Sequence, residues 1–334
     1  MVHIKERSGD YNQKKMTLKT DRGIFIPNTS FSTPVLFLIF NRPDTTQQVF
    51  SAIREAKPPR LYVAADGPRS DYPNEDEKCE HSRKIATNVD WDCEVKTFFR
   101  ENNLGCKLAA SQAIDWFFEQ ELEGIILEDD CLPDQSFFWF CQELLGKFRD
   151  DTRIMHIGGT NFQFGKERTK YSYYFSRYTH LWGWASWRRA WKYYDVKLKQ
   201  WPEGKKNEIL LNWADDRRFI NFWEILFEKA ASGNLDTWDP QWIFTCWSQN
   251  GLSVVPSVNL VSNLGFSKDS THSQDVKSPL AYMSTKAITF PMEHPNHIVR
   301  HWKADRHVEC QQFSRPPLSR LLQKFKRLIR WRDE

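Results

Sequence analysis

Four short runs of strand type alternate with helix-like segments over the first half of the chain. They cover 35–40, 61–65, 93–99 and 124–127, and each one ends in a polar turn. Strands that alternate with helices predict parallel pairing in one doubly wound sheet, and the turns after such strands gather at a single edge. The sequence therefore predicts an α/β fold of Rossmann-like type, in which a mostly parallel sheet carries helices on both faces.

The chain divides into four parts by composition. Residues 1–33 form a polar leader without the apolar core of a signal peptide, and 34–150 hold the alternating segments. Residues 151–313 are rich in aromatic side chains and are expected to complete the same domain. Residues 314–334 form a basic tail of helical spacing, and no apolar run is long enough to span a bilayer.

Composition narrows the function classes. The net charge of +4 is too small to indicate a nucleic-acid-binding protein. Seven cysteines without a C-x-x-C pair argue against a zinc site and a disulfide framework, and they suit a reduced cytoplasm. Fifteen Trp and 24 Phe commonly fill cores, but Trp also stacks on sugar rings and bases, so their number points weakly to carbohydrate or nucleotide.

Three consecutive carboxylates follow the last of the four runs, at Glu128-Asp129-Asp130. Their mutual repulsion has to be offset by solvent, by a basic neighbour or by a bound cation. Mg²⁺ and Mn²⁺ prefer oxygen ligands, and open α/β sheets bind ligands just beyond the carboxyl ends of their strands. The triplet is placed for a metal site, and the alternative is an acidic loop that faces water.

Polar residues also end the other three runs, and we expect them at the same edge of the sheet. Each one alone is equally well explained as a turn residue, but four polar strand ends in succession favour a binding site. These residues are Asn41, Arg42, Asp66, Arg100 and Asn103.

Two aromatic segments of the second half are further candidates. Trp182-Gly183-Trp184 precedes a helix, and its glycine permits close backbone approach, so a ligand-facing loop is one interpretation. Asp239 precedes Pro240, and its alternative role is an N-cap with proline in the first helical turn.

Four short motifs at the strand ends, taken in chain order, resemble those of the nucleotide-sugar glycosyltransferases of the GT-A fold. The similarity runs from about 34 to 275 and is nearest to the bacterial family-2-like enzymes of surface-polysaccharide loci. The acidic motif is also similar to that of the animal N-acetylglucosaminyltransferase that starts complex N-glycans, and the segments 182–184 and 238–242 resemble the aromatic and catalytic blocks of the bacterial group. The motifs are Phe40-Asn41-Arg42-Pro43, Ala65-Asp66-Gly67-Pro68, Asn102-Asn103-Leu104-Gly105 and Leu127-Glu128-Asp129-Asp130.

The resemblance implies a nucleotide-sugar-binding half over 34–150 and an acceptor and catalytic half over 151–313. Within the first half, Asp130 would bind Mn²⁺ or Mg²⁺ directly, Asp129 would face the ribose or a metal-bound water, and Glu128 would support the sheet end or the base. Asp66 would accept a hydrogen bond from the base or the ribose. The remaining donor contacts would be Asn41 and Arg42 near the nucleotide and its phosphates, the cations Arg100 and Lys107, Asn103, and the rings of Trp182 and Trp184.

Catalysis by inversion needs a carboxylate that takes the proton of the acceptor hydroxyl. The resemblance assigns this role to Asp239, with Asp236 in reserve, and makes His272 a second metal ligand or a diphosphate contact. The metal would stabilise the departing nucleoside diphosphate, so no acid is needed to protonate it. The motif reads Glu-Asp-Asp where Asp-X-Asp is common, which leaves the division of labour among the three acids open.

We therefore expect a metal-dependent, inverting glycosyltransferase that uses a nucleotide-diphosphate sugar, with UDP-sugars favoured, and a glycan or lipid-linked acceptor. A sugar-nucleotidyltransferase is the alternative enzyme, although Asn41-Arg42-Pro43 is not the glycine-rich phosphate loop it would want. A catalytically silent sugar- or nucleotide-binding subunit of a polysaccharide assembly complex is the alternative from another class.

The basic tail carries apolar residues at helical spacing, from Leu318 to Ile329, with Arg and Lys on its other faces and Trp331 near its end. Such a helix suits an anionic membrane surface. We expect a cytoplasmic protein that is peripheral on the inner face of the cell membrane. The alternative is a tail that docks on its own domain or on the second subunit of a homodimer.

Overall fold

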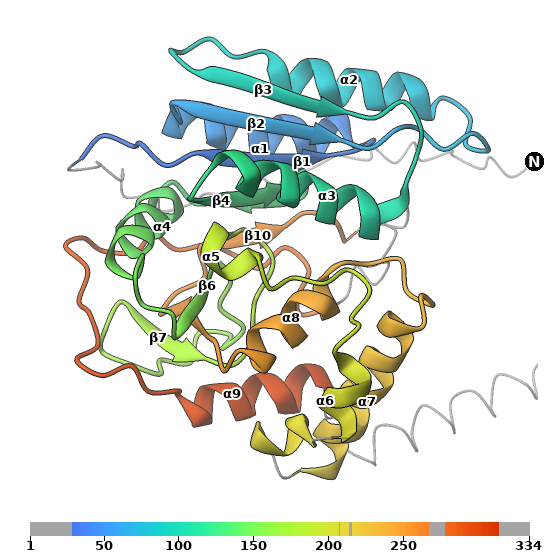
Figure 1. Cartoon of the computed structure of the whole chain (residues 1–334). Helices are drawn as coiled ribbons and strands as arrows, with labels where there is room; N and C mark the ends of the chain where they lie inside the picture. The colour runs from blue at the N-terminus through green and yellow to red at the C-terminus, as the bar shows by residue number, and fades with distance from the viewer. Residues whose placement is uncertain (1–28, 207, 214–215, 267–277, 314–334) are drawn as a thin grey trace, which may run out of the picture.

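The computed structural model describes residues 29–206, 208–213, 216–266 and 278–313. The leader up to residue 28, the basic tail 314–334 and His272 lie outside the described residues. An eight-stranded sheet forms the centre of the molecule, in the order β3-β2-β1-β4-β8-β6-β9-β7 (Figure 1). The predicted α/β class with a mostly parallel sheet between helices is confirmed.

The four predicted runs form the parallel half of this sheet. They are β1 (Val35–Ile39), β2 (Arg60–Ala65), β3 (Glu94–Phe99) and β4 (Glu123–Glu128), and the pairs β1–β2, β1–β4 and β2–β3 are all parallel. Their carboxyl ends therefore meet at one edge, as predicted. The helices between them are α1 (Pro43–Ala56), α2 (Glu75–Thr87) and α3 (Gly105–Gln120).

The second half completes the sheet with strands of both directions. These are β6 (Ile154–Gly158), β7 (Tyr173–Ser176), β8 (Trp184–Trp187) and β9 (Leu252–Pro256). β8 lies antiparallel between β4 and β6, β9 is parallel to β6, and β7 is antiparallel to β9. A second, two-stranded sheet pairs β5 (Cys131–Pro133) with β10 (Val261–Asn263).

Helices cover both faces of the central sheet. On one face α1 packs with α4 (Ser136–Lys147), and on the other α3 packs with α8 (Asp239–Ser248). The remaining helical elements are α5 (Arg188–Trp191), α6 (Trp201–Lys206), the 3₁₀ turn η1 (Ile209–Asn212), α7 (Arg217–Ala231), α9 (Trp302–Val308) and the π-turn η2 (Glu309–Phe313). Of these, α5 packs against α3 and β8, while α6, α7 and α9 gather below α8 in Figure 1.

Most of the described tryptophans belong to these cores rather than to a surface. Trp184 and Trp242 pack between the sheet and α8, and Trp201, Trp223 and Trp247 fill a third cluster between α6, α7 and α8. The aromatic composition is therefore explained mainly by core packing. No helix in the described part of the chain is long and apolar enough to cross a membrane.

One buried histidine in this core is held by both of its ring nitrogens. The Nδ1 atom of His156 accepts a hydrogen bond from Trp242 Nε1 at 3.3 Å, so Nε2 carries the proton and donates to the His180 carbonyl at 3.1 Å. Burial lowers the pKa of His156 from 6.5 to about 3, and burial together with His156 lowers that of His180 to about 3. Both rings are therefore neutral in the folded protein at pH 7.

Replacing His156 by Gln is expected to make the protein less sensitive to mild acid. Because the folded pKa lies below the unfolded one, the stability present above pH 6.5 is lost as the pH falls towards 3. At pH 5, each histidine that stays neutral in the folded protein lowers the unfolding free energy by about 2 kcal/mol relative to pH 7. An amide can keep one donor and one acceptor, so His156→Gln should reduce the loss of unfolding free energy between pH 7 and pH 5 by about 2 kcal/mol.

Urea unfolding at a series of pH values measures this difference. The control is His81→Gln, which makes the same substitution at an exposed histidine outside this core. If the unfolding free energies of the wild type and His156→Gln fell by the same amount between pH 7 and pH 5, the neutral state assigned to His156 would be wrong.

Candidate functional site

The acidic triplet lies where β4 ends, and two neighbouring strands hold it in place. The Phe40 amide, just after β1, donates to Asp129 Oδ2 at 2.9 Å. The Leu264 amide, just after β10, donates to the Asp130 carbonyl at 2.7 Å. Asp129 is 6% exposed and Asp130 is 9% exposed, and Glu128 is the half-buried last residue of β4, so the triplet is not an acidic loop that faces water.

Arg42 is the basic neighbour of the triplet. Its Nη1 atom lies 2.7 Å from Asp130 Oδ2 and 3.3 Å from Asp129 Oδ1. Burial acts to lower the pKa of Arg42, but the charges of Asp129, Asp130 and Glu128 outweigh it and raise the pKa above its usual value. The predicted convergence of the strand ends at 41–42 and 128–130 is therefore present in the structure.

The carboxylates of the triplet still repel one another in the presence of Arg42. Burial raises the pKa of Glu128, and the charges of Asp130 and Asp129 raise it further while Arg42 opposes them. Burial also raises the pKa of Asp129, against the opposing charge of Arg42. One guanidinium thus faces three carboxyl groups, and additional positive charge at this site would be stabilising.

A divalent cation fits this donor set, although the protein alone does not enclose it. Among the described residues no group of three or more His, Cys, Asp or Glu side chains forms a metal cage. Mg²⁺ is commonly held by one or two carboxylates together with substrate phosphates, and the adjacent carboxylates of Asp129 and Asp130 match that pattern. The predicted ligand His272 falls outside the residues that the structure describes.

Two carboxylates from distant parts of the chain cap the first turn of α3. Asp66 accepts from the backbone amides of Leu104 and Gly105 at 3.0 and 3.1 Å. Asp236 accepts from those of Cys106 and Lys107, each at 3.0 Å. All four amides at this helix start are therefore satisfied, and negative charge there is favoured by the helix dipole.

This capping gives Asp66 and Asp236 structural partners that the sequence did not indicate. Asp66 also accepts from the Gly67 amide at 2.9 Å, so its carboxylate is already engaged by the backbone. The predicted contact of Asp66 with a base or ribose stays a prediction. Asp236 is committed to α3, which weakens its case as the reserve base.

The other residues of the first half that we predicted to contact the nucleotide sugar make hydrogen bonds within the protein. Asn41 Nδ2 donates to the buried carboxylate of Glu75 at 2.7 Å, and Asn103 Nδ2 donates to the Gly67 carbonyl at 2.8 Å. Arg100 Nη2 donates to Gln112 Oε1 at 2.6 Å, on the outer side of α3. Lys107 lies in the capped first turn of α3 and is half-buried.

Asp239 comes to the same edge from the second half of the chain. It is the first residue of α8, and Trp238 is the N-cap, so the alternative reading of Asp239 as the N-cap is wrong. The Thr237 hydroxyl donates to its carboxylate. Its charge contributes to the raised pKa of Glu128, so the carboxyl groups of Asp239 and Glu128 lie within electrostatic reach of each other.

Cys106 lies within electrostatic reach of acids from both halves of the chain. Its side chain reaches solvent, yet burial is the largest cause of its raised pKa, followed by the charges of Glu128, Asp236 and Asp239. Carboxylates from both halves of the chain therefore lie near one another at the carboxyl edge of the sheet.

The two predicted tryptophans differ in their surroundings. Trp184 is completely buried in β8, with its ring stacked on those of His156 and Trp238, so the prediction that it faces a ligand is wrong. The reason is that helices cover both faces of the sheet at this strand. Trp182 is half-buried and meets the Phe266 ring edge-on at 5.7 Å, so its predicted ligand contact stays a prediction.

Sequence reasoning missed two residues of this edge. Glu75 is 3% exposed, accepts a hydrogen bond from Asn41 and forms an ion pair with Arg69. In the sequence it is only one of several residues in a polar stretch. Gly265 lies directly against Asp130: a Cβ atom there would be 2.1 Å from Asp130 Oδ2. A glycine after a short extended segment gave no sign of that contact.

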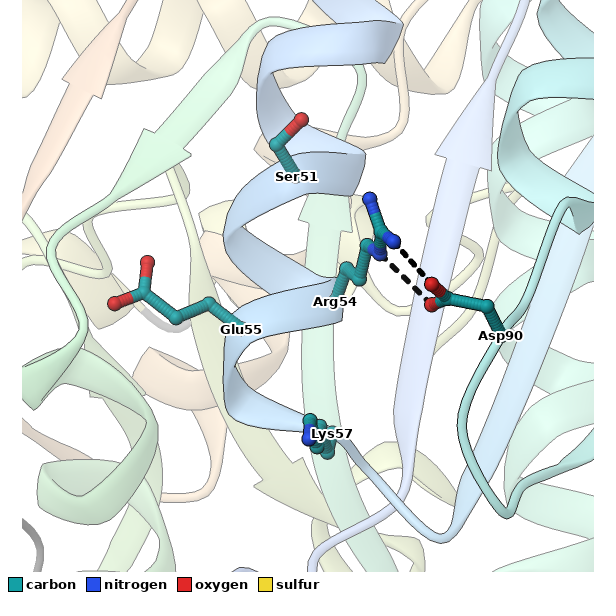
Figure 2. Close-up of a pocket in the computed structure, with 5 residues that line it drawn as sticks. All are labelled: Ser51, Arg54, Glu55, Lys57 and Asp90. Carbon is teal, nitrogen blue, oxygen red and sulfur yellow. Dashed lines mark hydrogen bonds and ion pairs between the residues drawn. The ribbon is translucent and has the colours of Figure 1, made fainter.

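A separate surface hollow lies at the opposite edge of the sheet (Figure 2). It is lined by Ser51, Arg54, Glu55, Lys57 and Asp90, around the end of α1 and the turn before β3. Figure 2 shows that Arg54 points to Asp90, with which it forms an exposed ion pair. This pair neutralises its most prominent cation, so the hollow is a weaker candidate for an anionic ligand.

Comparisons with known proteins add little to this geometry. No protein-family model matches the chain, and no curated protein matches it. Three similar solved structures are HddC from Yersinia pseudotuberculosis (10% identity, 48% of this chain and 80% of that chain, TM-score 0.29), a UDP-glucose pyrophosphorylase complexed with UDP-glucose (12%, 43% and 62%, 0.26) and the UTP-bound UGPase from Acinetobacter baumannii (8%, 89% and 98%, 0.33). Similarity at this level supports no inference about activity.

Proposed function

We propose that the protein is a metal-dependent, inverting glycosyltransferase that moves a sugar from a nucleotide-diphosphate donor, with UDP-sugars favoured. The supporting observation is the meeting of two adjacent carboxylates, Asp129 and Asp130, with Arg42 and Asp239 at the carboxyl edge of the sheet. The first three are suited to a metal–diphosphate group. The fourth comes to the same edge from another part of the chain and can act on a second substrate.

In this proposal the donor lies across the carboxyl ends of β1 and β4. Asp130, with Asp129 beside it, would hold Mn²⁺ or Mg²⁺, and His272 would add a second metal ligand or a diphosphate contact. When bound, the cation offsets the negative charge that grows on the departing nucleoside diphosphate. Arg42 is close enough to Asp130 to share the same diphosphate, because one of its nitrogens is already 2.7 Å from that carboxylate.

Asp239 would take the proton of the acceptor hydroxyl. The acceptor oxygen then attacks the anomeric carbon from the face opposite the diphosphate, the carbon–oxygen bond to the diphosphate breaks, and the configuration inverts. Asp239 begins α8, where the helix dipole favours its ionised form, which is the form a base needs.

The proposal extends to the setting of the reaction. The acceptor would be a glycan or a lipid-linked saccharide of surface-polysaccharide synthesis. The basic tail 314–334 would keep the protein on the inner face of the cell membrane, and a homodimer contact is the competing role for that tail.

Product analysis tests the proposed function. The full-length protein is screened with a panel of nucleotide sugars and Mn²⁺ for thermal stabilisation, and then for release of the nucleoside diphosphate with and without EDTA. Chelator-sensitive release, with the sugar recovered on an acceptor or as free sugar, is expected. Formation of pyrophosphate from a nucleoside triphosphate and a sugar phosphate would instead identify a nucleotidyltransferase, and binding without any turnover would identify a silent binding subunit.

Replacing Gly265 by Ala is expected to lower transfer by about 100-fold. The new methyl group would overlap Asp130 Oδ2, so either the carboxylate or the segment that follows β10 must move. A displacement of a site group by about 1 Å can cost about 100-fold in rate.

The steady-state rate at saturating donor measures this effect. Gly146 in α4 is the matched control, because a Cβ atom there meets nothing within 4 Å and Gly146→Ala should leave the rate unchanged. Full activity of Gly265→Ala would show that the position of Asp130 does not limit the reaction.

A further inference from the structure

Arg42 and its two acidic partners are not equally free to move. Asp129 is tied at Oδ2 to the Phe40 amide, and Asp130 is tied at its carbonyl to Leu264 and packed against Gly265. The side chains of these acids are 8% and 12% exposed, whereas that of Arg42 is 32% exposed. If the pairs separate, the long, partly exposed guanidinium moves and the carboxylates stay.

The location of Arg42 is unfavourable except for these partners. It is the N-cap of α1, where the helix dipole disfavours a cation, and its side chain makes no capping hydrogen bond. Its Nη1 atom is shared between Asp129 and Asp130. The pairs with the triplet are therefore what holds the guanidinium at this helix start.

The same oxygens that Arg42 contacts are those that a divalent cation would need. Asp129 offers Oδ1, since Phe40 holds Oδ2, and Arg42 lies on that Oδ1 and on Asp130 Oδ2. The other oxygen of Asp130, Oδ1, accepts from the Cys131 thiol at 3.5 Å. A cation at Asp129 Oδ1 and Asp130 Oδ2 has to displace the guanidinium. A displaced guanidinium in a partly buried site needs a new anion, because an unpaired charge there is costly.

We propose that Arg42 is an exchangeable counter-ion. It neutralises Asp129 and Asp130 in the free protein, and it transfers to the donor diphosphate when the cation arrives with the nucleotide. A planar guanidinium suits both partners, because carboxylate and phosphate oxygens accept its donors in the same geometry. This inference rests on the proposed function and adds to it a coupling between the two ligands. A cation that binds alone competes with Arg42 for the carboxylates, whereas a cation that binds with a nucleotide does not, because Arg42 then pairs with the diphosphate.

The exchange predicts a positive coupling between metal and nucleotide that depends on Arg42. In the wild type, the nucleoside diphosphate should tighten Mn²⁺ binding, and by reciprocity Mn²⁺ should tighten nucleotide binding by the same factor. Removing the guanidinium frees the carboxylates for Mn²⁺ and removes a diphosphate contact, so the two affinities should move in opposite directions.

Binding of Mn²⁺ to the full-length protein is measured by electron paramagnetic resonance, alone and with UDP, GDP or dTDP. Compared with the wild type, Arg42→Gln is expected to bind Mn²⁺ alone about tenfold more tightly and to show a coupling factor about tenfold smaller. Arg42→Lys keeps the charge but not the planar fork, so its values should lie between the two. Arg54→Gln removes the exposed cation of the opposite edge and should match the wild type.

Two results are distinguishable failures. If Mn²⁺ binds the wild type in the presence of a nucleotide, but Arg42→Gln and Arg42→Lys bind Mn²⁺ alone no more tightly than the wild type, the exchange is overturned and the proposed function stands. If the wild type binds no Mn²⁺ with any of the three nucleotides, the proposed function fails and the exchange fails with it. Circular dichroism of each variant shows whether it is folded, and one folded Arg42 variant suffices for the comparison.

Discussion

Replacement of Asp239 by Asn is expected to lower the rate of sugar transfer by about 100- to 10,000-fold, the range over which a general base contributes. The amide is nearly isosteric and can still accept from the Thr237 hydroxyl, so the start of α8 should keep its structure. What it cannot do is take a proton from the acceptor. The loss should therefore be in kcat, with the affinity for the donor little changed.

Asp236→Asn is the matched control for this prediction. Asp236 lies three residues earlier, in the segment that leads into α8, and its carboxylate caps α3 through the amides of Cys106 and Lys107. Asn can accept from only one of these two amides, so this variant should lose some stability, but its rate should stay within about tenfold of the wild type because no proton-accepting group of the reaction is removed. An inactive Asp236→Asn beside a fully active Asp239→Asn would move the base to Asp236.

Loss of the buried ion pair between Arg177 and Glu309 is expected to destabilise the fold by about 3–5 kcal/mol, the cost of leaving one charge of such a pair alone. Arg177 Nη2 lies 2.7 Å from Glu309 Oε2, and the two residues are 3% and 7% exposed. The same guanidinium donates to the Tyr178 hydroxyl and the Trp213 carbonyl, and it stacks over the Phe219 ring. Glu309→Leu would leave these contacts around a buried cation that has lost its hydrogen-bonded carboxylate and keeps the longer-range charge of Asp305.

A double-mutant cycle read by urea unfolding checks this expectation. Arg177→Met with Glu309→Leu should be more stable than Glu309→Leu alone, because two apolar side chains replace the pair and no lone charge remains. The exposed pair of Arg54 and Asp90 is the control, and Arg54→Ala should leave the unfolding free energy without a measurable change. If the buried and the exposed substitutions changed the unfolding free energy by the same amount, the contacts of Arg177 would not be what holds η2 to the rest of the second half.

Local patterns were sufficient for the parallel half of the sheet. The runs that became β1, β2, β3 and β4 are apolar or alternating over strand-length windows, and each ends in a turn that the sequence marks clearly. Parallel strands with helical crossovers then have to present their carboxyl ends together. The arrangement of β8, β6, β9 and β7 could not be read in this way, because it depends on pairings between segments far apart in the chain.

The aromatic second half shows where local patterns mislead. Trp182 and Trp184 are separated by one glycine and look alike in sequence, yet one is half-buried beside Phe266 and the other lies at the centre of the core. Trp184 is the first residue of β8 and is covered by the core around α8, whereas Trp182 lies in the segment before that strand. Burial of a ring is a property of its neighbours, which the sequence does not specify.

The sequence by itself determined that three carboxylates follow an apolar strand, and that the turns after the neighbouring strands meet them at one edge. Spacing and strand chemistry are local, so they could be read residue by residue. Only the tertiary structure decided which charges meet there: Arg42 on Asp129 and Asp130, Asp66 and Asp236 on the start of α3, and Asp239 within reach of Glu128. These contacts act over a few ångströms between atoms that are distant along the chain, so only the folded backbone can bring them together.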